Sequence, residues 1–292
     1  MTRTRSQKTW LALGLVAVLM MTGSVVWAGD AVKLRFKFKP GDKQVYRMTM
    51  GQKMEVETDM APGMTQKVNI TINTDMYQKV LKQDGTGAVL EVGYTRMDAN
   101  MSVSGQPMPI PGADELTKVR MTMKMSELGE LGEAKVVSEK GLGNKALKMA
   151  DEMKKSIAQG AMIFPEKALK PGDSWSHKQK VPTKLAGTKD MNMDVVSVYT
   201  FVGMDKFKGK PAAKVTAKVK ILLTGKAVQN NIPMDTNLSG RGSSVSFFSV
   251  EDGRTLKTKT NMDIQGTVIA SAQGKKFNTK LKIKTKVEMT LK

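Results

Sequence analysis

The sequence has 292 residues and a formal net charge of +20 at pH 7, with 47 Lys and Arg against 27 Asp and Glu. An apolar content of 40% and a charged content of 25% are ordinary for a folded chain, which excludes wholesale disorder and a polytopic membrane protein. The absence of cysteine excludes disulfides, thiolate metal sites, a cysteine nucleophile and lipid attachment through an N-terminal Cys.

Residues 1–28 have the features of a signal peptide. A basic region that starts at Arg3 precedes an uncharged apolar run at 10–21, and small residues lead up to a cleavage point after Ala28. The sequence therefore predicts a periplasmic or secreted protein. The alternative is an uncleaved N-terminal membrane anchor, because the uncharged stretch is just long enough to span a bilayer.

Apolar and polar residues alternate through most of the chain after residue 30. Leu34, Phe36 and Phe38 alternate with basic residues, which predicts a first strand at 32–38, and the run at 281–292 alternates with lysine. Strands of a parallel sheet covered on both faces would be apolar throughout, so this pattern disfavours a nucleotide-binding doubly wound fold. It predicts antiparallel sheets with one dry face and one wet face.

The segment 144–160 breaks the alternation. Leu147, Ala150, Met153 and Ile157 recur at three- and four-residue spacing among charged residues, which is helix periodicity. We expect one amphipathic helix here, linking an N-terminal β repeat at 29–143 to a C-terminal β repeat at 161–292.

The two halves share a turn motif. Proline presets the second position of a type II turn and glycine supplies the positive φ of the third. The structural turns predicted on this basis are formed by Pro40, Gly41 and Asp42 in the first half and by Pro171, Gly172 and Asp173 in the second. Each follows a lysine, and together they indicate an internal duplication.

The paired Lys-Pro-Gly-Asp turns, the segment 164–175 (FPEKALKPGDSW) and the exported N-terminus resemble an uncharacterised family of bacterial exported β-rich proteins, a domain of unknown function. The resemblance covers the chain after residue 28. Several members of that family are similar to lipoproteins, but this chain lacks the cysteine that lipid anchoring needs. The resemblance implies no activity.

No constellation for catalysis stands out. The single histidine, His177, has Asp173, Ser174 and Ser176 as neighbours, but adjacent strand residues point to opposite faces, so these do not form a triad. The motif at 141–146 fits the G-x-G-x-x-A pattern without the βαβ unit that a dinucleotide site requires. We therefore expect no enzyme and no cofactor.

Methionine is unusually frequent, with 24 residues. Met121, Met123 and Met125 share one face of a predicted strand, and soft thioether ligands select Cu(I). The simpler interpretation is that methionine fills gaps on the dry face, because its side chain is flexible. A Met-rich Cu(I) site is kept as an alternative.

Lysine supplies nearly all of the positive charge, and aromatic residues make up only 5% of the chain, so a nucleic-acid partner is not expected. The simpler interpretation of the lysine-rich face is that it keeps the sheets soluble and protects their edges, and an anionic lipid or envelope polymer is kept as the alternative partner class.

These observations predict a mostly β fold of two tandem antiparallel β repeats. They would form curved open sheets, arranged as a half-barrel or a sandwich, joined by the helix. The function expected is an exported, non-enzymatic envelope protein that binds a hydrophobic or amphipathic ligand or a protein partner. The alternatives are a structural or interaction module without a ligand and the Cu(I)-binding protein.

Overall fold

The computed structural model describes residues 31–59, 61–110, 112–137, 143, 150, 162–183, 190–229, 232–272 and 274–292. The signal peptide expected at 1–28 lies outside these residues. So does the helix expected at 144–160, apart from Ala150, which is buried. Both stay predictions.

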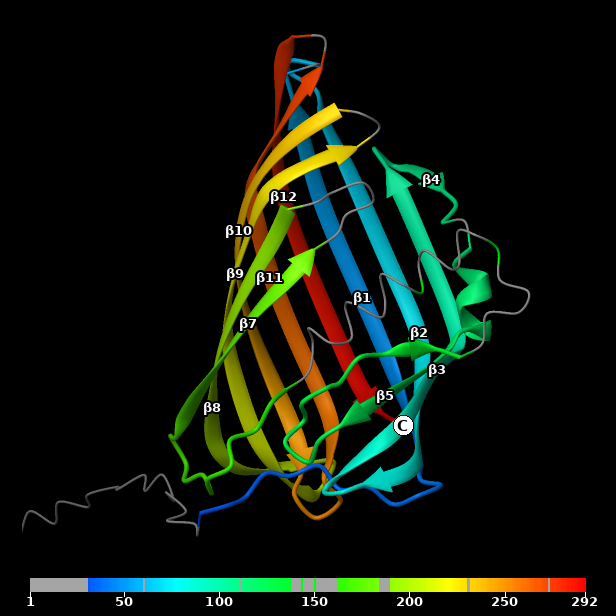
Figure 1. The fold of residues 1–292 in the computed structure, drawn as a ribbon, viewed down its shortest axis with the longest axis vertical. Helices are drawn as coiled ribbons and strands as arrows, with labels where there is room; N and C mark the ends of the chain where they lie inside the picture. The colour runs from blue at the N-terminus through cyan, green and yellow to red at the C-terminus, as the bar shows by residue number, and fades with distance from the viewer. Residues whose placement is uncertain are drawn as a thin grey trace, which may run out of the picture.

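The described chain is built almost entirely from antiparallel strands (Figure 1). In chain order the elements are β1 (Lys43–Thr58), β2 (Thr65–Asp84), β3 (Gly87–Val103), β4 (Gln106–Met108), the 3₁₀ helix η1 (Asp114–Lys118), β5 (Arg120–Met125), β6 (Lys135–Val136), β7 (Ser174–Thr183), β8 (Asp190–Phe207), β9 (Lys210–Gln229), β10 (Ile232–Ser249), β11 (Arg254–Ala272) and β12 (Lys275–Leu291). The prediction of a mostly β, antiparallel fold is confirmed.

All of these strands belong to one 12-stranded sheet, in the order β6-β5-β3-β2-β1-β12-β11-β10-β9-β8-β7, with β4 added beside β3. The chain starts in the middle of the sheet at β1 and meanders outward to β6. It then crosses to the opposite edge at β7 and meanders back until β12 pairs with β1. In Figure 1 the strands from the two ends of the chain, blue and red, lie side by side.

This topology corrects the expected arrangement of two curved sheets. The two halves meet in an uninterrupted ladder between β1 and β12, so they form a single open sheet, and the sandwich alternative is wrong. Alternation along each strand specifies which side chains share a face, but it carries no information about the lateral neighbour of a strand.

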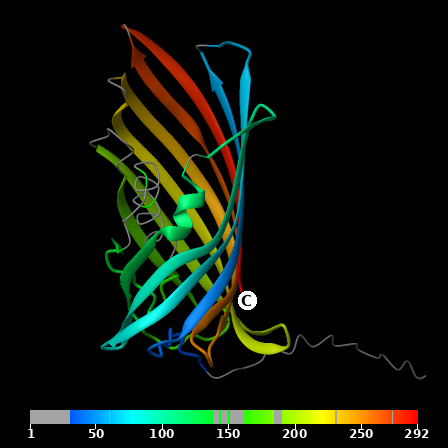
Figure 2. The same ribbon diagram turned by 90° about the vertical axis from the view of Figure 1, so that its right-hand side faces the viewer.

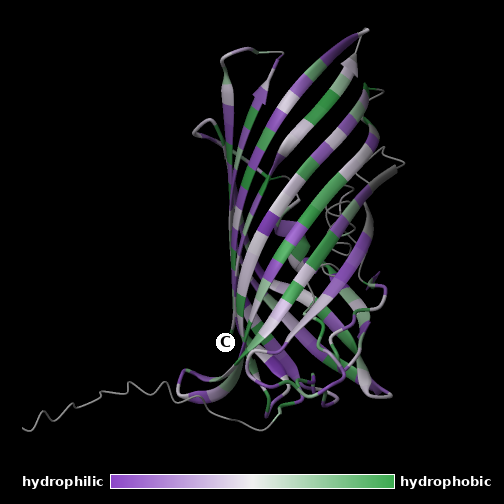
Figure 3. Cartoon of the chain, turned by 90° about the vertical axis from the view of Figure 1, so that its left-hand side faces the viewer, coloured by the Kyte–Doolittle hydropathy of each residue, from purple (hydrophilic) through white to green (hydrophobic). Residues whose placement is uncertain are grey.

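The register places the dry and wet residues on opposite faces over most of the sheet. Met54 of β1 lies directly opposite Ile283 of β12, and one residue away Lys53 lies opposite Lys284 on the other face. Figure 3 shows the result as alternating hydrophobic and hydrophilic bands along the strands. We name the face that carries Met54 and Ile283 the inner face, and the lysine-bearing face the outer face.

The sheet is strongly curved, as Figure 2 shows. Gly266 of β11 lies at a point where strands approach closely, because a Cβ atom added there would overlap the carbonyl oxygen of Asn237 in β10. Glycine within a strand is typical of such bends and close approaches.

The segment expected as a first strand at 32–38 is instead irregular apart from one bridge at Val32. Val32 and Leu169 exchange two backbone hydrogen bonds of 2.8 and 2.9 Å, and Phe36 N donates to Glu127 O at 2.8 Å. The segment therefore runs beneath the sheet instead of joining it, and its apolar residues close one end of the inner face.

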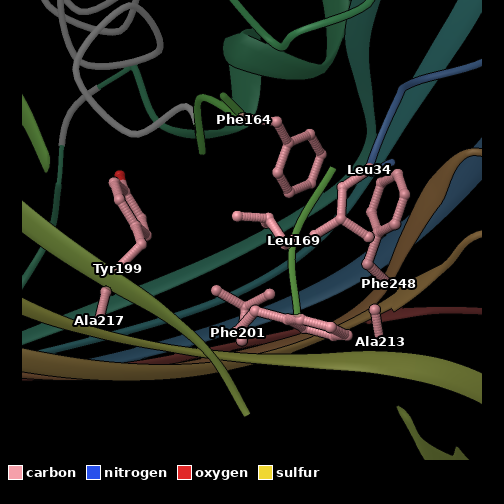
Figure 4. Close-up of a cluster of buried hydrophobic side chains, with 9 residues drawn as sticks. Leu34, Phe164, Leu169, Tyr199, Phe201, Ala213, Ala217 and Phe248 are labelled. Atoms are coloured by element: carbon pink, nitrogen blue, oxygen red, sulfur yellow. The ribbon is translucent and has the colours of Figure 1, made fainter. Parts of the chain in front are cut away.

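We name this closed end the base. Its centre is an aromatic group in which the ring centroids of Phe164 and Phe248 are 4.8 Å apart and each lies within 5.3 Å of Phe36. Figure 4 shows Leu34, Phe164 and Leu169 packed onto Phe201, Ala213 and Phe248 of the sheet. Leu34, Phe164, Leu169 and Phe248 are each at most 2% exposed, so the base is a genuine hydrophobic core.

The two Lys-Pro-Gly-Asp motifs both lie in reverse turns at the base. Gly41 and Gly172 have φ values of 84° and 93°, which favour glycine. Gly41 N donates to Val80 O and Gly172 N to Phe201 O, at 2.9 and 2.7 Å. The aspartate that follows each glycine accepts a return bond at its carbonyl oxygen, so Pro40, Gly41, Asp42 and Pro171, Gly172, Asp173 have matching environments.

Candidate functional site

The inner face beyond the base carries a continuous row of apolar residues. Side chains directly opposite each other in neighbouring strands contact one another, so the register defines which residues form a row across the sheet. From β2 to β8 this row, which we name the apolar belt, consists of Val68, Met54, Ile283, Ile264, Gly240, Ile221 and Val195.

The belt is an accessible surface. Apart from Gly240, which is buried, the belt residues have intermediate exposure, unlike the fully buried residues of the base, and none of the seven belongs to the three hydrophobic core clusters of the described residues. Apart from η1 against β3, the main contacts between described elements join lateral neighbours of the sheet.

A second row lies above the belt, on the side away from the base. It places Val56, Leu281, Leu238 and Leu223 around Gly266. On the base side the next row is partly polar, with Gln52 opposite Thr285. The inner face beyond the base is therefore most apolar over two adjacent rows, the belt and the row above it.

The belt is long as well as apolar. It crosses seven adjacent strands, and a strand spacing of about 4.8 Å gives it a length of about 29 Å along the curve of the sheet. Half of a bilayer hydrocarbon core is about 15 Å thick, so the belt is longer than the span that one acyl chain covers in a bilayer leaflet.

The outer face differs in chemistry. It contains a hollow of about 780 Å³ that spans β8 to β12 and lies behind the belt. Its charged lining residues are Lys220, Arg241, Lys282, Lys284, Asp194 and Asp263. None of these six side chains forms an ion pair with another described residue, so the hollow has an excess of unneutralised positive charge.

Met121, Met123 and Met125 occupy successive inner-face positions of β5 and are buried. Met121 packs with Leu116 and Val119, whereas Met123 and Met125 belong to a different cluster around Val80 and Leu90. Their surroundings are apolar side chains, as expected if methionine fills space. The Cu(I) alternative stays a hypothesis.

His177 lies on the inner face of β7, opposite Ser197. Two of its sequence neighbours have other partners: Asp173 Oδ2 accepts a hydrogen bond from Lys170 N, and Ser174 Oγ lies 2.8 Å from Thr200 Oγ1. Within the described ranges, no hydrogen bond joins His177 to either residue. Two residues along, Trp175 stacks on Tyr199, with ring centroids 5.3 Å apart, and donates to Ile163 O at 2.7 Å.

Other chemical sites receive no support from the described geometry. Of the glycine motif at 141–146, only Gly143 is described, and its N–H donates to Glu115 Oε2 at 2.7 Å. In the part of the chain that the structure covers, no three His, Asp or Glu side chains are grouped so that they could hold a metal. The same part contains no helix long and apolar enough to cross a membrane.

No protein-family model matches the sequence, and no curated protein matches it. Among solved structures, a structure of lipovitellin that concerns its lipid–protein interactions aligns with 88% of this chain, with a TM-score of 0.50 and 10% identity. The chain spans 25% of the lipovitellin chain. The likeness is therefore one of fold.

Two Pseudomonas aeruginosa structures also align. The alignment with OccK11 (OpdR) includes 89% of this chain and 100% of the OccK11 chain, with a TM-score of 0.22 and 9% identity. The alignment with OccK5 (OpdH) includes 86% of this chain and 98% of the OccK5 chain, with a TM-score of 0.23 and 8% identity.

The belt could not be found from the sequence alone. The apolar face of each strand follows from its alternation, but the assembly of seven strands into one row depends on the β1–β12 pairing and on the register. The outer hollow has no local sequence signal, because its charges come from five separate strands.

Proposed function

We propose that the protein is an exported, non-enzymatic binder of a lipid or another amphipathic molecule with a long apolar chain, held on the apolar belt. The observation that carries this proposal is the accessibility of the belt: a continuous apolar surface of this length is ordinarily covered in a soluble protein. An acyl chain lying along the belt would cover it.

The composition of the inner face suits a ligand of variable shape. Methionine side chains on the inner face of the central strands include Met48, Met50 and Met54 in β1, Met262 in β11 and Met289 in β12. Unbranched thioether side chains adapt to irregular apolar surfaces and are frequent at promiscuous binding sites. We therefore expect selectivity for the class of ligand and not for one chain length.

The similarity of fold to lipovitellin supports the same class of function, because the lipovitellin structure concerns lipid–protein interactions. The lysine-rich outer face supports the partner class expected from the sequence, an anionic lipid surface or envelope polymer. Export to the periplasm or the extracellular space is part of the proposal and rests on the signal peptide expected at 1–28.

The direct test is native mass spectrometry of the protein purified after export without detergent. We expect species whose added mass corresponds to an amphiphile that organic solvent extracts. The delipidated protein should then bind a fluorescent fatty acid, with an emission change typical of transfer to an apolar environment. Absence of both signals would reject a lipid-binding function.

A pair of matched variants localises binding to the belt. The double variant Met54→Gln with Ile283→Gln places two amide groups in the belt. A bound apolar chain would leave these amides without hydrogen-bond partners, so we expect fatty-acid binding to weaken by about tenfold or more. The control, Lys53→Gln with Lys284→Gln, changes the adjacent pair of the same two strands on the outer face. Equal loss in both double variants would place the ligand elsewhere.

A protein partner is the second candidate, favoured by a different observation. Val198 and Leu222 lie on the outer face of β8 and β9, and Val202 and Met204 lie further along β8; the exposures of these four side chains are between 42% and 46%. Chemical crosslinking in whole cells, followed by purification, should capture one defined partner if this patch is an interface. Loss of that crosslink in Leu222→Ser would assign the patch to it.

A further inference from the structure

The end of the sheet opposite the base includes the tips of three hairpins of the described chain. We define the rim as the described residues of 57–67, 226–235 and 267–280, which join β1 to β2, β9 to β10 and β11 to β12. Figure 2 shows two of these tips at the far end of the molecule from the base. Large apolar side chains are exposed there: Met64 at 71%, Val228 at 45%, Ile269 at 37% and Ile232 at 36%.

At the rim the division into a dry face and a wet face ends. In the lower part of β11 the outer-face positions are polar, as at Asp263 and Gln265, but at the tip Ile269 occupies an outer position between Val268 and Ala270. Strands that are apolar on both faces are typical of segments surrounded by an apolar medium on both sides. In an aqueous compartment this arrangement has no benefit for the isolated protein.

Positive charge accompanies these apolar tips. Lys67, Lys226, Lys275, Lys276 and Lys280 belong to the rim, against Glu57, Asp59 and Asp235. Of the three acids, Asp59 accepts a hydrogen bond from the backbone N–H of Asn278 within the rim. None of the five lysines forms an ion pair with a residue in the described ranges, and although Lys226 lies opposite Asp235 and Lys280 opposite Glu57, the described rim carries a net positive charge.

The rim is also continuous with the apolar belt. Ile264 of the belt and Ile269 of the rim are five residues apart on β11, about 17 Å along the strand. Leu281 and Val268 lie between these two levels on the inner face. A molecule that enters at the rim therefore meets apolar side chains along the path to the belt.

From these observations we propose that the rim docks on an anionic lipid bilayer, with the hairpin tips in the interfacial region, and that the apolar chain of the ligand passes there between the bilayer and the belt. The apolar tips would enter the boundary between headgroups and acyl chains, and the lysines would face the anionic headgroups. This inference rests on the proposed function for its purpose, but the docking itself is a separate property.

Because the chain has no cysteine, docking can be measured with single labelled cysteines. Met64→Cys and Ile269→Cys carry an environment-sensitive fluorophore at the rim, and Leu222→Cys carries it at a position of similar exposure, 43%, away from the rim. With vesicles of phosphatidylcholine and phosphatidylglycerol we expect a blue shift at positions 64 and 269 and none at 222. A shift at all three positions, or at none, would overturn the proposal.

The contribution of charge is tested by vesicle flotation. Lys275→Gln with Lys276→Gln is expected to weaken binding to the anionic vesicles by about tenfold, because each lysine near an anionic surface adds to the binding energy. High salt should weaken binding of the unmodified protein as well, and pure phosphatidylcholine vesicles should bind poorly. Flotation that is insensitive to lipid charge, salt and these substitutions would contradict the assignment.

The two proposals fail in different ways. Rim variants should still bind a soluble fluorescent fatty acid in the absence of vesicles, because the belt is intact. Fatty-acid binding without vesicle docking would reject the rim alone. Docking without fatty-acid binding would reject the ligand function and leave the rim as a membrane-docking surface.

Discussion

Lys292 donates a hydrogen bond of 2.6 Å from its Nζ to Oδ2 of Asp75, although β1 lies between their strands. Arg47 of β1 adds a contact of 3.3 Å from its Nε to Oδ1 of the same carboxylate. The Lys292 hydrogen bond, followed by that of Arg47, holds the pKa of Asp75 below its usual value against the opposing effect of burial. The carboxylate thus connects β2, β1 and β12 at the place where the two halves of the sheet meet.

The first prediction concerns this carboxylate. Asp75→Asn should lower the free energy of unfolding at pH 7 by about 1 kcal/mol, a modest value because Lys292 and Arg47 are partly exposed to solvent. A carboxyl group with a depressed pKa in the folded state stabilises the protein above its unfolded-state pKa of about 3.9, and this stabilisation is lost as the pH falls through the lower folded-state value. Urea unfolding at pH 7 and pH 3 should show the difference between the two proteins shrinking at the lower pH. A difference that is constant with pH would contradict the ion-pair explanation.

The second prediction concerns the base. Phe164→Ala should cost about 3–5 kcal/mol of stability, because Phe164 is fully buried between Phe36 and Phe248 and its removal leaves a cavity. Thermal unfolding measures the loss, and Val202→Ala, at an exposed position, should change stability by no more than about 0.5 kcal/mol. Similar effects of both substitutions would mean that the base is not the main core.

The third prediction concerns the bend at Gly266. Gly266→Ala should destabilise the protein by about 2 kcal/mol or more, because the new methyl group would overlap the backbone of Asn237 and Leu238 in β10. The matched control is Gly51→Ala in β1, where an added Cβ meets no atom within 4 Å. Denaturant unfolding of both variants tests the difference. If Gly266→Ala is as stable as the control, the close approach of β10 and β11 is not required.

The fourth prediction decides between the two roles of the β5 methionines. If they fill space, replacing Met121, Met123 and Met125 by Leu should cost less than about 1.5 kcal/mol at each position and leave Cu(I) uptake unchanged. Uptake is measured by competition with a chromophoric Cu(I) chelator under reducing conditions. Stoichiometric uptake by the unmodified protein that the triple variant loses would establish the copper site instead.

Much of the fold follows from local patterns in the sequence. The run at 281–292 alternates because its apolar residues share the inner face of β12, and the Pro-Gly pairs form turns because Gly41 and Gly172 adopt positive φ. Local chemistry decides these features, so they can be predicted without knowledge of the rest of the chain.

Other features depend on distant partners. The segment at 32–38 alternates like a strand, yet it does not join the sheet, because β2 and β12 already pair with both edges of β1. Its residues Leu34 and Phe36 pack in the base instead. The apolar belt requires Met54 and Ile283 to be neighbours, which no local pattern specifies. The loss of the dry and wet faces at the rim does have a local signal, the consecutive apolar residues Val268, Ile269 and Ala270. Such an interruption of a regular alternation indicates an unusual environment.

The pairing of β1 with β12 has a consequence for how the protein is made. Thr58 and Thr279, hydrogen-bonded at 3.3 Å, are 221 residues apart in the chain. Ladders between such distant strands form slowly, because a large loop must be closed before any contact is gained. Until β12 is available for pairing, β1 presents an unpaired edge with a methionine-rich face, a state prone to aggregation. Folding of this protein should therefore depend on chaperones that bind the unpaired edge until the final strand is available.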